Sequence, residues 1–362
     1  MPSSKQHYDS LQAGRGLAAV AVLLFHTWLM ARDKLGHVFA QNLFIHGDRG
    51  VDFFFVLSGF IILHANWSSV GVPNDAPRYF YRRLVRVYPI FLVITAVKLA
   101  YMLLGGPGIP AYKSGLSHLL CSTLLIPLPD FPFLAVSWSL CFEMFFYSIF
   151  LLFILFGWRF RWWLFLHVAV CLVINIPGMP GLDYPGGFFV HTRILDFYLG
   201  CAAAWICARG FVSTRLALTL AACGVGMLLV GHFTHDQLEA TFRALGPLYW
   251  GIAFFLIITG VATLERLKHF SVPRWLTYLG DASYSVYLVH NNVILVGGAV
   301  LAKRLHLVED YFSLAMFVVA GASLAAGIAC YQFIEKPVLR WFQNKGPVRN
   351  SDGARPVSGR SA

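Results

Sequence analysis

Charged residues are scarce in this sequence. Asp, Glu, Lys and Arg make up 12% of the 362 residues, whereas 58% are hydrophobic. Charged residues account for about a quarter of an ordinary soluble domain, so this composition excludes one. It predicts an all-α polytopic membrane protein. The net charge of +11 is scattered over loops and the tail, which argues against a nucleic-acid partner.

The sequence also lacks the cysteine and histidine spacings typical of metal sites. None of the seven cysteines belongs to a CxxC pair, and most lie in apolar segments, where they act as small hydrophobic residues. We therefore expect neither disulfides nor a metal cofactor. The first apolar run is too long for a signal peptide and has no small-residue cleavage site, so we expect an uncleaved span.

Apolar windows of about 17 to 25 residues predict about ten transmembrane helices. The loops between them are too short to hold a separate core. We expect one transmembrane domain, 1–343, followed by a disordered polar tail, 344–362. The ten windows are 11–30, 49–66, 88–105, 133–156, 160–177, 191–208, 215–233, 245–264, 283–302 and 312–334.

The distribution of Lys and Arg predicts the orientation. With the N-terminus inside, more than twice as many basic residues fall on the cytoplasmic side as on the outer side. This bias agrees with the positive-inside rule. We therefore expect both termini to be cytoplasmic, as an even number of spans requires.

The first span, 11–30, carries two ionisable residues. Arg15 lies near its inner end, and His26, eleven residues later, lies about 16 Å deeper along the helix axis. A structural interpretation is that Arg15 extends to the interface and His26 is a satisfied polar group between helices. An ionisable residue this deep in a span favours a functional interpretation.

A basic and aromatic segment, 78–89, precedes the third span. If it is helical, Arg82 and Arg86 share a face, and Arg83 lies next to them. Guanidinium groups bind phosphate, so this segment is a candidate site for coenzyme A. The alternative is a juxtamembrane segment that binds anionic lipid headgroups.

The second span contains Asp52 near its outer end and Ser58 and Gly59 near its middle. A small polar pair usually packs helices together. Gly59 would also let an acyl thioester approach the backbone closely. We therefore assign Ser58 and Gly59 to the donor site as well.

Two later spans carry further polar groups. Glu143 lies about 10 Å into the fourth span, in the outer half together with His26, so we expect the two to meet. A carboxylate beside an imidazole raises its basicity, as a general base needs; the alternative is a Glu that only joins helices. The ninth span places a second imidazole near mid-membrane. We assign to substrate binding Asp52, Trp138, Ser139, Tyr287 and His290.

Polar residues at mid-membrane are also typical of transporters, so a multi-span transporter or flippase of a sugar or small metabolite is the alternative function. No internal repeat relates the two halves of the sequence. A scaffold without chemistry is a second alternative. The strongest polar signals lie in the first four spans.

Six motifs in order resemble the membrane-bound acyltransferase family 3, whose members O-acylate bacterial surface and exported polysaccharides. The likeness runs from about Gln12 to Trp341. It consists of the R-x10-H of Arg15 and His26, GVDFFFVLSGF, RRLVRVYP with the R-x-x-R of Arg83 and Arg86, SWSLCFE, SYSVYLVH and the closing IEKP of 334–337.

The resemblance implies an enzyme of the bacterial cytoplasmic (inner) membrane that transfers an acetyl or other acyl group. The donor would be cytosolic acetyl-CoA or another acyl-CoA, and the acceptor a saccharide hydroxyl outside, possibly on a lipid-linked precursor. It implies a catalytic His26 and donor-binding Arg15, Arg83 and Arg86; we add Glu143 as the partner of His26. A small-molecule acceptor is an open alternative.

Overall fold

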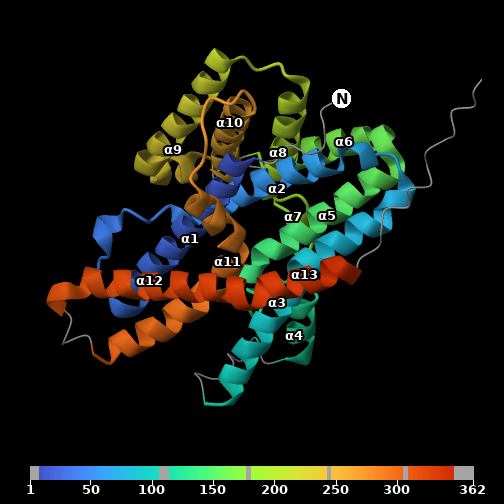
Figure 1. Ribbon diagram of the computed structural model, residues 1–362. Helices are drawn as coiled ribbons and strands as arrows, with labels where there is room; N and C mark the ends of the chain where they lie inside the picture. The colour runs from blue at the N-terminus through green and yellow to red at the C-terminus, as the bar shows by residue number, and fades with distance from the viewer. Residues whose placement is uncertain are drawn as a thin grey trace, which may run out of the picture.

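The computed structural model describes residues 8–105, 113, 115–176, 181–242, 246–304 and 309–345, and over these residues every regular element is a helix (Figure 1). The all-α prediction is therefore confirmed. The elements are α1 (Asp9–Leu35), α2 (Gly50–Asn66), α3 (Ala76–Leu103), α4 (Leu116–Thr123), α5 (Trp138–Phe156), α6 (Arg161–Ile174), α7 (Gly186–Phe189), α8 (Arg193–Arg209), α9 (Thr214–Phe242), α10 (Gly246–Arg266), α11 (Arg274–Ala302), α12 (Phe312–Cys330), a π-helical turn (Tyr331–Glu335) and α13 (Lys336–Lys345).

Each of the ten predicted windows contains a helix, but only eight helical runs of the described residues are long and apolar enough to cross a membrane. α5 and α6 form one such run, interrupted at Gly157, whose φ is +64°. α8 has 17 residues and includes Arg193, Asp196 and Arg209. The protein is a multi-pass membrane protein, and the count of ten stays a prediction.

The third span begins earlier than the sequence suggested. α3 starts at Ala76, with Pro77 in its first turn, and continues through Pro89 to Leu103. Proline suits the first turn because that turn's N–H groups lack helical partners. The basic segment is thus part of a long helix, which lets its arginines reach the interior of the bundle.

Glycines let the central helices approach closely. α1 packs mainly against α11, and α2 against α8. A Cβ on Gly280 would overlap the carbonyl oxygen of Gln12, and one on Gly200 would overlap that of Val56. Small residues at such crossings strengthen van der Waals packing, which drives helix association in a bilayer.

Contacts between helix ends agree with spans that alternate in direction. The backbone N–H of Asp9 donates to Glu265 at 2.7 Å, and Gln12 Nε2 donates to Asp281 at 2.6 Å. These partners lie in segments that the ten-span arrangement puts on one side of the membrane. α12 and α13 follow one another in nearly one line (Figure 1). Of the predicted tail, 344–362, residues 344 and 345 end α13, and the rest lies outside the described residues.

Candidate active site

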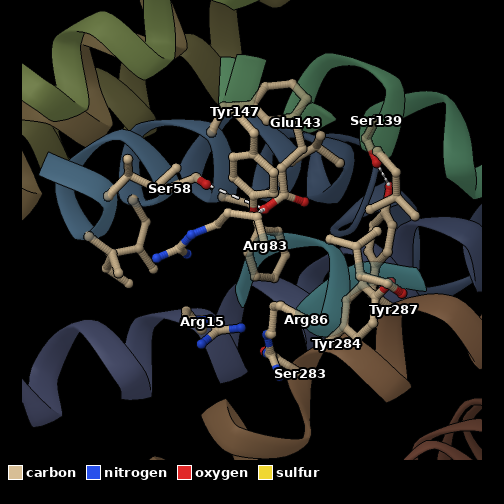
Figure 2. Close-up of a pocket in the computed structure, with 18 residues that line it drawn as sticks. Arg15, Ser58, Arg83, Arg86, Ser139, Glu143, Tyr147, Ser283, Tyr284 and Tyr287 are labelled. Atoms are coloured by element: carbon tan, nitrogen blue, oxygen red, sulfur yellow. Dashed lines mark hydrogen bonds between the residues drawn. The ribbon is translucent and has the colours of Figure 1, made fainter. Parts of the chain in front are cut away.

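A cavity of about 190 Å³ lies among α1, α2, α3, α5 and α11, and we call it the arginine cavity. Figure 2 shows Arg15 and Arg86 on one side of it and Glu143 and Tyr147 on the other. Its polar lining residues are Arg15, Ser58, Arg83, Arg86, Ser139, Glu143, Tyr147, Ser283, Tyr284 and Tyr287. The tertiary structure therefore brings together residues from sequence positions 15 to 287.

The guanidinium groups of this cavity have different partners. Arg86 Nη1 lies 2.7 Å from Glu335 Oε1. Arg83 lies 5.6 Å from the ring centroids of Tyr79 and Tyr147 and forms no ion pair with any described carboxylate. Positive charge therefore exceeds negative charge around the cavity, which favours an anionic ligand.

Arg82 does not belong to this group. Its side chain is exposed, and it does not line the cavity, although it is adjacent to Arg83 in α3. Successive residues of a helix point about 100° apart, so neighbours in the chain do not share a face. The expectation that Arg82 lines the donor site with Arg83 and Arg86 is not met.

Glu143 has different neighbours from those expected. Its carboxylate accepts hydrogen bonds from the hydroxyl groups of Tyr147, one turn later in α5, and Ser58, at 3.4 Å. His26 contacts neither oxygen, so the expected pairing of Glu143 with His26 is wrong. The two residues line different cavities.

His26 lies in a second, larger cavity of about 880 Å³, which we call the histidine cavity. Aromatic rings from several elements line it, among them Phe131, Trp138, Phe142 and Phe188, together with polar groups of Asp48, Asp130, His191 and Arg193. Val51 and Tyr287 line both cavities. The two cavities therefore adjoin one another.

Tyr287 stands at this boundary with Ser139. Their hydroxyl oxygens are 2.7 Å apart, and both lie within hydrogen-bonding distance of the carbonyl oxygen of Val136, at 3.1 Å. Ser139 is thus bonded across to α11. Trp138, the preceding residue, stacks under the guanidinium of Arg193, whose carbon lies 4.9 Å from the ring centroid.

The hydrogen bonds of His26 define which ring nitrogen is basic. Nδ1 lies 2.9 Å from the carbonyl oxygen of Val22 and 3.2 Å from Nε2 of His290. His290 Nδ1 lies 3.2 Å from the carbonyl of Val286. Carbonyl oxygens only accept hydrogen bonds, so we assign a proton to Nδ1 of each ring. The lone pair of His26 is then on Nε2.

His290 does not face either cavity. It is fully buried; its ring contacts His26 and its own helix, and its carbonyl oxygen accepts a hydrogen bond from Ser323 of α12. The prediction that it binds substrate therefore lacks a structural basis. A second imidazole that accepts from Nδ1–H of the first makes the first ring more basic, as a carboxylate would do more strongly.

Asp52 and Gly59 also face away from the cavities. Asp52 accepts a hydrogen bond from Arg193 Nε at 3.3 Å. A Cβ on Gly59 would overlap the carbonyl oxygen of Phe197. Gly59 thus serves the contact of α2 with α8, and the idea that it admits a thioester is wrong.

Three residues of the site escaped the sequence analysis. Tyr147 follows Glu143 by one helical turn, a spacing that could have revealed the pair. Glu335 appeared in a motif without a role, although a glutamate in an apolar helix is itself a signal. Arg193 could not be placed because its partner, Asp52, lies 141 residues away.

The described residues contain no group of three or more His, Cys, Asp or Glu side chains arranged to hold a metal ion. The groups that line the two cavities and could carry chemistry are the arginines, Glu143 and His26. Together they offer an anion-binding cavity next to an imidazole with a free lone pair.

Comparison with known proteins agrees with this chemistry. The sequence profile of the acyltransferase domain matches residues 8–331. The exopolysaccharide production protein ExoZ of Rhizobium meliloti is 31% identical over 88% of this chain and 95% of its own length. The acyltransferase MdmB of Streptomyces mycarofaciens is 26% identical over 96% of each chain.

A third relative is longer than this chain. The peptidoglycan O-acetyltransferase OatA of Listeria monocytogenes is 26% identical over 93% of this chain but only 56% of its own length. No solved structure matches the chain. Because the acyltransferase profile covers nearly all of the sequence, the protein is an acyltransferase that belongs to the membrane-bound acyltransferase family 3.

Proposed function

We propose that this protein is an integral-membrane O-acyltransferase. It transfers an acetyl or related acyl group from cytosolic acyl-CoA to a hydroxyl group of an exported polysaccharide or its lipid-linked precursor. One observation carries the proposal: a cavity lined by three arginines adjoins a cavity lined by His26, with Tyr287 and Val51 common to both.

The arginine cavity is the donor site in this proposal. Its volume of about 190 Å³ is below the roughly 300–1,000 Å³ of sites that enclose a whole drug-sized ligand. It therefore holds part of the donor, with its phosphates attracted by Arg15 and Arg83. The acyl end of the pantetheine arm points toward the boundary at Tyr287.

The histidine cavity is the acceptor site. At about 880 Å³ it has room for a sugar residue, and its aromatic rings offer faces for the apolar side of a pyranose. Asp48, Asp130 and Arg193 supply hydrogen-bonding groups for the hydroxyls. The relative ExoZ is named an exopolysaccharide production protein, which supports this class of acceptor.

His26 carries the chemistry by one of two routes. As a general base, Nε2 takes the proton of the sugar hydroxyl while its oxygen attacks the thioester carbonyl; CoA leaves as the thiolate and receives the proton from the imidazolium. Alternatively, Nε2 attacks the carbonyl and CoA leaves as the thiolate. The hydroxyl then takes the acyl group from the acyl-imidazole, and its proton passes to the CoA thiolate. Both routes need the lone pair that Val22 and His290 leave on Nε2.

The orientation that we propose puts the N-terminus and the donor site toward the cytosol of a bacterium, in its inner membrane. The Lys and Arg distribution supports it. The start of α1 contacts Glu265 and Asp281, so these segments share the side on which the N-terminus lies. The acceptor would then be acylated on the outer side.

The decisive test is His26→Ala in cells that otherwise lack the protein. We expect complete loss of ester-linked acyl groups from the cell polysaccharide, measured by alkaline release and chromatography, with unchanged protein in the membrane. His269→Ala is the matched control, because His269 is exposed and contacts Thr214 away from both cavities. Wild-type acylation by His26→Ala would refute the proposal.

A further inference from the structure

A buried glutamate, Glu335, contacts Arg86, which lines the arginine cavity. Glu335 ends the π-helical turn Tyr331–Glu335 between α12 and α13. A π-helical turn adds a residue to a helix and rotates the side chains that follow it, and such turns occur frequently at functional sites. Here the turn directs Glu335 into the bundle, where it is fully buried.

Both carboxylate oxygens of Glu335 are occupied. Oε1 accepts from Arg86 Nη1 at 2.7 Å, and Oε2 accepts from the Ser285 hydroxyl at 2.6 Å. Arg86 in turn lies over the ring of Tyr284, with its guanidinium carbon 5.3 Å from the centroid. The guanidinium of Arg86 is therefore held by the carboxylate of Glu335 and by the ring face of Tyr284.

The other arginines of the cavity are held differently. Arg15 contacts Gln12 Oε1 at 3.2 Å, and Arg83 leans on two tyrosine rings and leaves its buried Nε without a partner. Within the described part of the chain, neither has a carboxylate as close as Glu335 is to Arg86. Arg86 is thus the arginine whose direction is set by another residue.

We propose that Glu335 is a positioning residue for the acyl donor: it directs the guanidinium of Arg86 so that its remaining N–H groups face the donor in the arginine cavity. This inference rests on the proposed function, since it assumes that the cavity takes the donor. A guanidinium has five N–H groups in a rigid plane, so a bond from Nη1 to Glu335 fixes the plane and leaves the others for a phosphate or carbonyl oxygen. It also makes the segment 331–335 part of the donor site.

The structural alternative is that the pair only joins α12 to α3. A double-mutant cycle separates the two, because a residue that acts through Arg86 has no effect on donor binding once Arg86 is gone. Acetyl-CoA is titrated into the full-length protein in detergent or nanodiscs. The wild type, Glu335→Gln, Arg86→Met and the double variant are compared. Glu265→Gln is the matched control, because Glu265 binds the start of α1.

We expect Glu335→Gln to weaken acetyl-CoA binding about tenfold, and Glu265→Gln to leave it unchanged. In the Arg86→Met background, Glu335→Gln should change the dissociation constant by less than about twofold. Equal losses in both backgrounds, or no loss in either, would overturn the inference. Wild-type protein that binds no acetyl-CoA would instead refute the proposed donor.

If Glu335→Gln does not accumulate in the membrane, Ser285→Ala provides the same test more gently. It removes one hydrogen bond from the Glu335 carboxylate and leaves its charge. We expect a loss of acetyl-CoA affinity of about threefold, again absent in the Arg86→Met background. An equal loss in that background would count against the positioning role.

Discussion

At the scale of single residues, the structure divides the arginines of α3 by the direction in which they point. Arg83 and Arg86 line the arginine cavity, whereas Arg82 is exposed. A phosphate bound by a guanidinium in a partly buried site gains strong, charge-assisted hydrogen bonds. The same charge on an exposed surface is largely screened.

Arg83→Gln should therefore raise the KM for acetyl-CoA about 20-fold with little effect on the KM for the acceptor. Arg82→Gln, one residue earlier, is the control and should leave both constants unchanged. Steady-state kinetics with purified protein and each substrate varied in turn make the comparison. If Arg83→Gln raised both constants equally, a role in lipid anchoring would explain it better.

His290 acts at the same scale through its contact with His26. Replacement by Phe keeps a ring of similar shape but removes the acceptor for Nδ1–H, so His26 becomes a weaker base. We expect kcat to fall about tenfold with the KM for acetyl-CoA unchanged. His269→Phe should not change kcat; an unaltered kcat in His290→Phe would show that the Val22 carbonyl alone suffices.

At the scale of elements, glycines determine how closely the helices approach. Gly59 and Gly200 hold α2 against the backbone of α8, and Gly280 holds α11 against α1. These crossings carry residues of both cavities, such as Ser58 on α2 and Tyr287 on α11. The geometry of the site therefore depends on residues that touch no substrate.

Gly59→Ala should lower the thermal stability of the protein, since the added methyl group would overlap the carbonyl oxygen of Phe197. We expect a loss of about 2 kcal/mol, visible as a lower Tm in detergent by fluorescence-detected size-exclusion chromatography. Gly321→Ala in α12 is the control, because no atom lies within 4 Å of the Cβ it would add. Equal Tm values for the two variants would contradict this account of the α2 and α8 contact.

At the scale of the whole molecule, the arrangement links an arginine-lined cavity to an aromatic one through Tyr287. If the N-terminal side faces the cytosol, the proposed donor and the proposed acceptor approach from opposite sides of the bilayer. Such an arrangement lets an acyl group cross the membrane without the passage of CoA itself. The proposed function therefore depends on this orientation.

Reporter fusions test that orientation. Alkaline phosphatase fused after residue 182, between α6 and α7, should be active, whereas the same enzyme fused after residue 268, between α10 and α11, should be inactive. Green fluorescent protein should give the inverse pattern. The opposite result at both positions would place the arginine cavity on the outer side and exclude cytosolic acyl-CoA as its ligand.

The sequence by itself determined the fold class. Long apolar windows with few charges cross a bilayer as helices, because a helix satisfies all of its backbone hydrogen bonds internally. It also indicated Arg15, His26, Arg83, Arg86 and Glu143, since ionisable side chains in apolar helices stand out. The grouping of the arginines with Glu143 in one cavity, and the place of His26 in the adjoining one, were only partly foreseeable. The helical period shows which residues share a face but does not show which face meets which neighbour.

Only the tertiary structure decided the partners. Glu143 pairs with Tyr147 and Ser58, His26 with His290, and Arg86 with Glu335. Two of these pairings join residues about 250 positions apart, His26 with His290 and Arg86 with Glu335. Such contacts depend on how whole helices are rotated and how they cross. Close contacts at glycines set this geometry, and local residue patterns do not encode it.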